Sequence, residues 1–161
     1  KKHYEKVIKI LIKKITLKND TFVHRDFHVS NLMLMNNKIG VIDTQDALFG
    51  NSAYDLASLI DDVRFETSNI LKEKIFDIYL RSNKKLNIKK FRNDFEIISV
   101  LRNLKIIGIF TRLAIRDKKK DYLKLIPYAW SLIRLRSKDN KMFKELNSLL
   151  NKTLLRSKLE K

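Results

Sequence analysis

Four residues carry the most specific chemical pattern in this sequence: His24, Asp26, Asn31 and Asp43. The stretch HRDFHVSN has the form H-x-D-x-x-x-x-N, and an apolar run ending in Asp43 follows it. In phosphoryl transfer, a carboxylate such as that of Asp26 accepts a hydrogen bond from the attacking hydroxyl and aligns it. Asn31 and Asp43 offer the hard oxygen ligands that Mg²⁺ prefers. The spacing therefore predicts a site for phosphoryl transfer.

The two histidines of the stretch have supporting roles in this interpretation. We expect His24 to brace the loop through hydrogen bonds, and His28 to approach the transferring phosphate. Two alternatives remain open. Asp26 could simply cap a turn. His24, Asp26 and His28 also alternate, so on a strand they would share a face and could bind a transition metal.

A predicted β-hairpin places the two metal-binding candidates together. Apolar runs flank Asn36 and Asn37, and asparagine tolerates the positive φ that a two-residue turn needs. With that turn, Met35 faces Lys38, and the pairing runs back to Asn31. Asn31 and Asp43 then lie at the open end of the hairpin, where cross-strand neighbours are about 5 Å apart.

The remaining sequence predicts a mainly helical α+β fold. Only three glycines and one proline occur in 161 residues, which favours long helices. Thr21 to Val23 is β-prone, and residues 44–52 are expected to form a loop. Apolar spacing predicts helices over residues 4–17, 54–64, 68–81, 91–116 and 139–159, with another opening at Pro127.

Three acids of the predicted helix at 54–64 invite separate interpretations. Asp55 lies at its start, where a carboxylate can satisfy free N–H groups or can brace the catalytic loop. Asp61 and Asp62 end its apolar stripe and are expected to be solvated.

Composition limits the partners and the compartment. The net charge of +17 could indicate a surface for nucleic acid or anionic membranes. The lysines are scattered with little aromatic interleaving, so we expect a solvated surface and no nucleic-acid partner. There is no cysteine, no apolar run of about 18 residues and no signal peptide, which together predict a cytoplasmic protein without a membrane span.

The segment HRDFHVSNLMLMNNKIGVIDTQDALFGNSAYDLASLIDD, residues 24–62, resembles the aminoglycoside phosphotransferase and choline kinase-like family of the protein-kinase-like fold. Within it, the sequence is most similar to bacterial sugar kinases that phosphorylate the anomeric hydroxyl of N-acetylmuramate and N-acetylglucosamine. The later segment RNLKIIGIFTRLAIRDKKKDYLKLIP is also similar to that branch, so the resemblance covers about residues 20 to 130.

The resemblance implies specific roles. Asp26 matches the family's catalytic aspartate, and Asn31 and Asp43 match its metal-binding pair. His24 matches the histidine that supports the loop, and Asp55 matches an aspartate that ties the loop to the following helix. Arg102 and Lys105 fall on a helix that lines the acceptor side, which makes them candidates for substrate binding. The implied cofactors are ATP and Mg²⁺.

The sequence also departs from the family. Thr44 stands where this branch usually has phenylalanine, which affects the packing of the metal loop. The N-terminal lobe, which in the family supplies the phosphate-covering loop, a lysine and much of the adenine pocket, has no counterpart in residues 1 to 20. We therefore expect residues 1–161 to form a C-terminal lobe that is completed by an N-terminal lobe of a parent protein or by a separate chain.

Taken together, the sequence predicts ATP-dependent transfer of phosphate to a small-molecule hydroxyl, most simply an amino sugar of cell-wall recycling. An aminoglycoside or choline-type acceptor is the alternative within this chemistry. The alternative from another class is a catalytically silent basic module.

Overall fold

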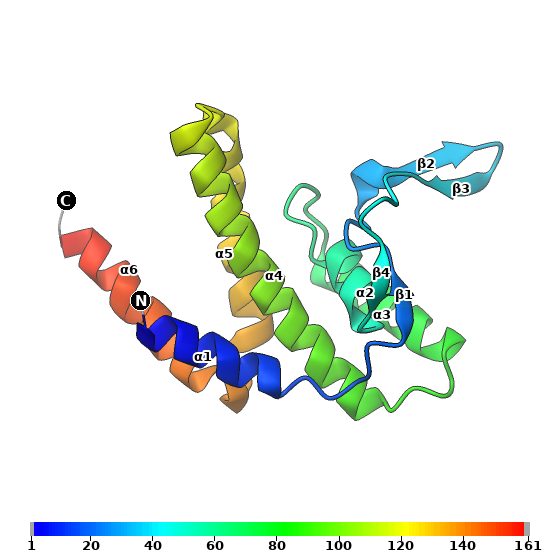
Figure 1. Cartoon of the computed structure of the whole chain (residues 1–161), viewed down its shortest axis with the longest axis horizontal. Helices are drawn as coiled ribbons and strands as arrows, with labels where there is room; N and C mark the ends of the chain where they lie inside the picture. Colours follow the sequence, from blue (N-terminus) through cyan, green and yellow to red (C-terminus); the bar gives the residue numbers. More distant parts are fainter. Residues whose placement is uncertain (1, 160–161) are drawn as a thin grey trace.

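The molecule is mainly helical, with two short pairs of antiparallel strands (Figure 1). It is known from a computed structural model that describes residues 2–159, with side chains through residue 152. The helices are α1 (Lys2–Lys13), α2 (Ala53–Ile60), α3 (Asn69–Ser82), α4 (Ile88–Arg116), α5 (Ile126–Ser137) and α6 (Lys144–Leu159), and the strands are β1 (Thr21–Val23), β2 (Leu32–Met35), β3 (Lys38–Val41) and β4 (Leu48–Gly50). Single 3₁₀ segments cover Val29–Asn31, Lys120–Leu125 and Lys141–Phe143. The α+β, mainly helical fold class is confirmed.

The long helix α4 organises the core. The Asn87 side chain caps its first turn by accepting a hydrogen bond from the Lys90 N–H, 3.0 Å away. Its first half packs Phe91 and Phe95 against α2 and α3, and its middle packs against α1, α5 and α6. Its last turns pack Phe110 against α5. Figure 1 shows α5 running beside α4, and α1 lying along α6.

The hairpin has the register that its turn predicts. Met35 pairs with Lys38, and Asn36 and Asn37 have φ values of 46° and 60°. These left-handed conformations define the two-residue turn that matches the twist of paired strands. The hairpin, β2 and β3, projects from the helical body in Figure 1.

The segment expected to be a loop contains a strand. β4 pairs with β1 so that Thr21 lies opposite Gly50 and Val23 opposite Leu48. A Cβ atom at Gly50 would lie 2.4 Å from Cγ2 of Val23, so any other residue here would force the Val23 side chain or the strands to shift. The prediction failed because the strand is short and its pairing partner lies far away in the sequence.

The first helix is shorter than predicted because the backbone that follows it is hydrogen-bonded to a buried carboxylate. α1 ends at Lys13, and the Thr16 and Leu17 N–H groups donate to Asp94 of α4 at 2.9 and 2.8 Å. Asp94 is fully buried, and Asn51 Nδ2 also donates to it at 2.8 Å. Asp94 therefore fixes both the entry to β1 and the turn before α2.

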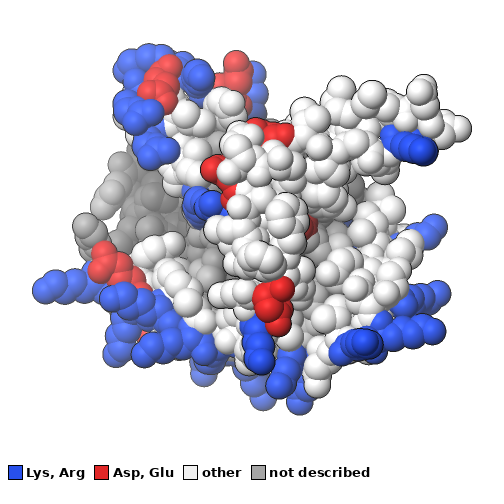
Figure 2. All heavy atoms as spheres, turned by 45° about the vertical axis from the view of Figure 1, so that its right-hand side comes forward, with Lys and Arg blue, Asp and Glu red and all other residues white. Residues whose placement is uncertain are grey.

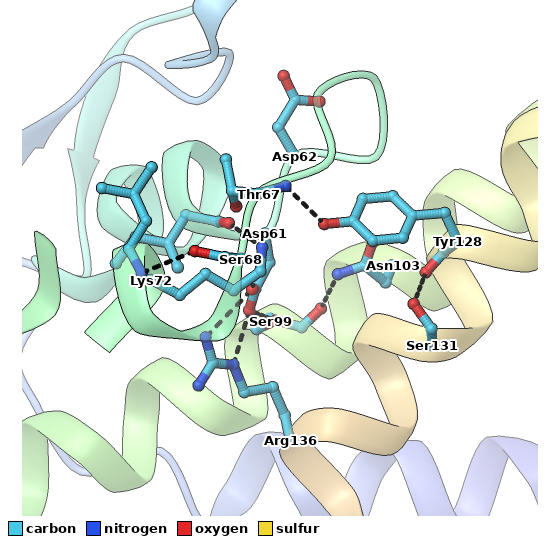
Figure 3. A network of polar contacts seen from close by, with 12 residues as sticks. Asp61, Asp62, Thr67, Ser68, Lys72, Ser99, Asn103, Tyr128, Ser131 and Arg136 are labelled. Carbon is cyan, nitrogen blue, oxygen red and sulfur yellow. Dashed lines mark hydrogen bonds and ion pairs between the residues drawn. The ribbon is translucent and has the colours of Figure 1, made fainter. Parts of the chain in front are cut away.

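The expectation that Asp61 and Asp62 are solvated is wrong, since both are buried. Figure 3 shows the network around Asp61: Arg136 donates through Nε and Nη2 at 2.9 and 3.1 Å, and the Ser99 hydroxyl donates at 2.6 Å. Lys72 Nζ lies 3.4 Å from the same carboxylate. Burial opposes the charge on Arg136, but the hydrogen bonds and charge of Asp61 raise the pKa of the guanidinium overall. These cations offset the cost of burying a carboxylate at the end of α2, where the helix dipole opposes it.

No helix among the described residues combines the length and the apolar character needed to cross a bilayer.

Candidate active site

The candidate catalytic loop, residues 24–31, is fixed to α2 by Asp55. Its carboxylate accepts hydrogen bonds from the backbone N–H groups of His24 and Arg25, at 2.7 and 3.0 Å. Arg25 has a φ of 73°, in the left-handed region that costs energy for a residue with a side chain. Asp55 thus stabilises a strained turn one residue before Asp26. Of the two interpretations open from the sequence, bracing of the loop is the one these contacts support.

His24 links the two halves of the site. It is buried, and its Nε2 lies 2.8 Å from the carbonyl oxygen of Ile42, while its Nδ1 accepts from the Asp26 N–H at 3.3 Å. A carbonyl only accepts and an N–H only donates, so these contacts require the tautomer with hydrogen on Nε2. The ring therefore connects Asp26 to the residue preceding Asp43.

The backbone around Asp26 presents its side chain outward. The Asp26 carbonyl accepts from the His28 N–H at 3.0 Å and from Asn31 Nδ2 at 2.9 Å. The carboxylate itself is exposed and has no hydrogen-bond partner in the described part of the chain. A substrate hydroxyl could therefore reach it without displacing a protein contact.

Asn31 and Asp43 both lie at the open end of the hairpin, next to its last paired residues. The Ile42 N–H donates to the Asn31 carbonyl at 3.1 Å, so the strand pairing extends to the residue before Asp43. Asn31 Nδ2 is held by Asp26, which leaves Oδ1 as the free atom of the amide. Gln45 donates to Oδ1 of Asp43, and within the described residues Oδ2 has no partner. The donor set of amide and carboxylate oxygens fits Mg²⁺.

The loop after Asp43 folds without the phenylalanine that is usual in the resembling branch. Thr44 is exposed, and its carbonyl accepts from the Ala47 N–H at 3.0 Å. Asp43 has a φ of 68°, and the Gln45 contact fixes its side chain. The turn is thus held by polar contacts, and Thr44 does not pack in the core.

A transition-metal site at His24, Asp26 and His28 is not formed. Both ring nitrogens of His24 are occupied by backbone groups. Across the described residues, no cluster of three or more histidine or carboxylate side chains is placed to hold a metal ion. That alternative therefore has no geometric support.

The acceptor-side candidates lie in one cavity with Asp26. A cavity of about 170 Å³ brings together Asp26, His28, Arg102 and Lys105. Arg102 donates to the Arg25 carbonyl at 3.2 Å and to the Ser58 hydroxyl, and it stacks over the Tyr54 ring at 4.8 Å. Arg102 therefore supports the loop, whereas Lys105 is exposed and has no partner among the described residues.

His28 has an unusual environment in this cavity. Burial and the positive charge of Arg64 lower the pKa of its imidazole, against the opposing effect of Asp62 and Asp26. Its Nδ1 is buried without a partner. The lowered pKa and the desolvation of the ring both favour the neutral form of the imidazole.

Sequence reasoning missed Asp94 and Asn51, which position the site from behind. Asn51 Oδ1 accepts from the Ala53 N–H at 2.9 Å while its amide donates to Asp94, so the pair orients the first turn of α2. The signal was present in the sequence: Asp94 interrupts the apolar stripe between Phe91 and Phe95. An acid on the buried face of a helix needs partners.

A face with few charges adjoins the candidate metal ligands Asn31 and Asp43. Figure 2 shows basic side chains gathered along the lower edge of this view, while the projecting hairpin is almost free of charge. Large apolar side chains are exposed on the hairpin and on β1 and β4, among them Leu34 at 75%, Ile39 at 69%, Phe22 at 63% and Phe49 at 72%.

Residues 4–87 match the Phosphotransferase enzyme family. The chain belongs to this family. The match contains the catalytic loop, the hairpin, Asp43, Asp55 and helix α2. It confirms, at the level of the family, the resemblance drawn from the sequence.

Three relatives within the phosphotransferases share the same name. The chain is 35% identical over 140 residues to an N-acetylmuramate/N-acetylglucosamine kinase of Neisseria meningitidis, covering 81% of this chain and 41% of that protein. It is 33% identical over 114 residues to the kinase of that name in Caulobacter vibrioides, covering 68% and 31%. The match in Pseudomonas putida is 30% over 136 residues, covering 81% and 40%. The chain thus spans about two fifths or less of the length of these relatives.

Proposed function

We propose that this chain is the C-terminal lobe of an ATP- and Mg²⁺-dependent kinase that phosphorylates an amino sugar, N-acetylmuramate or N-acetylglucosamine, in cell-wall recycling in the cytoplasm. The observation that carries the proposal is the geometry of the catalytic loop. Asp55 holds the turn before Asp26, and His24 joins Asp26 to the segment that bears Asp43. The names of the relatives supply the acceptor.

In this proposal the residues of the site have separate roles. Asp26 accepts a hydrogen bond from the acceptor hydroxyl and takes its proton as the oxygen bonds to the γ-phosphorus. The bond from that phosphorus to the β–γ bridging oxygen breaks, and ADP leaves. Asn31 and Asp43 would hold Mg²⁺ through their side-chain oxygens. When bound there, the ion would neutralise charge on the phosphates.

The exposed apolar face has a place in the same proposal. In the family that the sequence resembles, an N-terminal lobe supplies the phosphate-covering loop and much of the adenine pocket. Phe22 is paired with Phe49, and Leu34 with Ile39, across the two strand pairs, and all four side chains are exposed; such a lobe and the adenine would cover them. The lobe would belong to the parent protein or to a separate chain.

The cavity charges argue against the alternative acceptors. An aminoglycoside or choline is cationic and would meet the cationic side chains that line the cavity with Asp26, among them Arg64, Arg102 and Lys105. An amino sugar that is neutral or acidic avoids this repulsion.

The test is a phosphotransfer assay on the full-length protein that carries this chain. MgATP is supplied with N-acetylmuramate, N-acetylglucosamine, an aminoglycoside or choline. We expect turnover of an amino sugar, and a fall in kcat of about 100-fold or more for Asp26→Asn. Asp20→Asn, a change at an exposed aspartate before the loop, is the matched control and should keep full activity.

Two results would contradict the proposal. Activity of Asp26→Asn equal to that of the wild type would remove Asp26 from catalysis. Failure of the folded full-length protein to phosphorylate any of the four acceptors would reject the sugar-kinase assignment. Binding of RNA or anionic vesicles with steep salt dependence would then support the basic module.

A further inference from the structure

The cavity beside Asp26 is strongly cationic. Among the described residues, four basic side chains line it, those of Arg25, Arg64, Arg102 and Lys105, against the two carboxylates of Asp26 and Asp46. Its remaining wall is mostly an apolar surface of α4. A cavity with this excess of positive charge favours an anionic occupant.

Two of the four cations are already used by the fold. Arg102 is occupied by the Arg25 carbonyl, the Ser58 hydroxyl and the Tyr54 ring. Arg25 donates to the carbonyl of Asp46 at 3.3 Å. These two side chains hold the catalytic loop in place.

The other two cations are available to a ligand. Lys105 has no hydrogen bond or ion pair within the described residues. In the described part of the chain, the polar partner of Arg64 is Asp62, whose Oδ1 lies 3.3 Å from Nη1 and also accepts from the Arg64 N–H at 3.0 Å. The Asp62 side chain is 2% exposed and that of Arg64 is 40% exposed. A buried carboxylate therefore orients Arg64, and its Nε and Nη2 atoms have no hydrogen-bond partner among the residues that the structure describes.

The position of the cavity identifies which anion it receives. The cavity is lined by Asp26 but by neither Asn31 nor Asp43. A transferring phosphate bridged to a metal lies beside the metal ligands, and the attacking hydroxyl approaches in line from the opposite side. The cavity therefore lies where the acceptor enters.

We propose that Lys105 and Arg64 form a subsite for the carboxylate of an acidic amino sugar, and that this contact selects such an acceptor over its neutral counterpart. The inference rests on the proposed function and deepens it. N-acetylmuramate carries a lactyl carboxylate that N-acetylglucosamine lacks. An adjoining groove of about 540 Å³, which shares Arg25, Tyr54, Arg102 and Lys105 with the cavity, has room for the rest of the sugar.

The experiment measures steady-state kinetics of the full-length protein with both sugars. The variants are Lys105→Met and Arg64→Met, because methionine keeps the apolar stem and removes the charge. Lys89→Met, a change at another exposed lysine of α4 away from the cavity, is the control. We expect each cavity variant to raise KM for N-acetylmuramate about tenfold or more. A rise of this size corresponds to the loss of one charge-assisted hydrogen bond. KM for N-acetylglucosamine and KM for MgATP should stay within about twofold of the wild type, since neither ligand uses this contact.

Two kinetic outcomes would overturn the inference. An equal rise of KM for both sugars would show that the residues contact the sugar ring. A rise of KM for MgATP would show that they contact the phosphate.

A binding arm separates this inference from the proposed function. Equilibrium binding of each sugar without ATP is measured by calorimetry on the wild type and on Lys105→Met. Preferential binding of N-acetylmuramate that is lost in the variant would retain the subsite even if no sugar is turned over. Equal or absent binding of the two sugars by the wild type would reject the subsite, whether or not the kinase is active.

Discussion

Replacing Asp94 by asparagine should destabilise the protein, because it removes hydrogen bonds to a buried carboxylate that several donors share. The fully buried Asp94 side chain accepts from Thr16, Leu17, Asn51 and Asn93. Asparagine keeps one acceptor oxygen and turns an NH₂ group toward N–H donors. At least two charge-assisted hydrogen bonds are lost, each worth about 1.5–3 kcal/mol, so we expect a loss of about 3 kcal/mol or more.

The measurement is urea unfolding followed by far-ultraviolet circular dichroism. With an m-value of about 2 kcal/mol per molar, the midpoint of Asp94→Asn should fall by about 1.5 M. Asp121→Asn is the matched control, because the Asp121 carboxylate also accepts a hydrogen bond, from Lys124, but its side chain is 92% exposed. Its midpoint should not move.

The pH dependence tests the physical reason separately. Burial by itself raises the pKa of Asp94, but the hydrogen bonds from Leu17, Thr16, Asn51 and Asn93 hold it below the ordinary value of 3.8. A carboxyl whose pKa is lower in the folded state contributes stability that is present above its unfolded pKa and is lost as the pH falls through the folded pKa. The difference between wild type and Asp94→Asn should therefore shrink below pH 3.8. An unchanged midpoint at neutral pH, or a difference that persists undiminished in acid, would refute this reasoning.

Three further changes test other contacts. Asp55→Asn should lower kcat about tenfold or more and cost about 1.5–3 kcal/mol in urea unfolding, because one N–H of the strained loop loses its charged acceptor; an unchanged kcat would show that the loop holds its shape without this contact. Gly50→Ala should cost about 1–3 kcal/mol in urea unfolding, because its Cβ would press on Val23; a wild-type midpoint would mean that the two strands separate freely. Asn37→Gly should raise stability by about 0.5 kcal/mol, because its φ of 60° suits glycine; a lower melting temperature would contradict the turn assignment.

The hairpin and its neighbours show what can be predicted from spacing alone. Two asparagines between apolar runs fix a two-residue turn, and the turn fixes the register from Met35 and Lys38 back to Asn31. The long helices follow from apolar periodicity, and α4 covers all of the predicted range 91–116. These features depend on residues that are close in the sequence, so a local pattern contains them.

The errors have a common origin in contacts that span the chain. The sequence pattern predicts a helix over residues 14–17, but the backbone there is hydrogen-bonded to Asp94, which lies 78 residues after Thr16. The pattern also predicts that Asp61 is solvated, but Asp61 is buried and pairs with Arg136, 75 residues away. Burial of a polar group depends on the partners that packing brings to it, and spacing does not reveal them.

The sequence by itself determined which groups the proposed chemistry uses: the carboxylate of Asp26 as the candidate base, Asn31 and Asp43 as the candidate metal ligands, and the hairpin that joins them. Tertiary structure alone decided how that chemistry is held and approached. In the folded chain, Asp55 is hydrogen-bonded to the strained loop, and Asp94 binds the backbone behind the site. Arg64 and Lys105 line the same cavity as Asp26. The physical reason is that a motif encodes groups and their local geometry, whereas orientation, burial and the field in a cavity arise only when distant elements pack together.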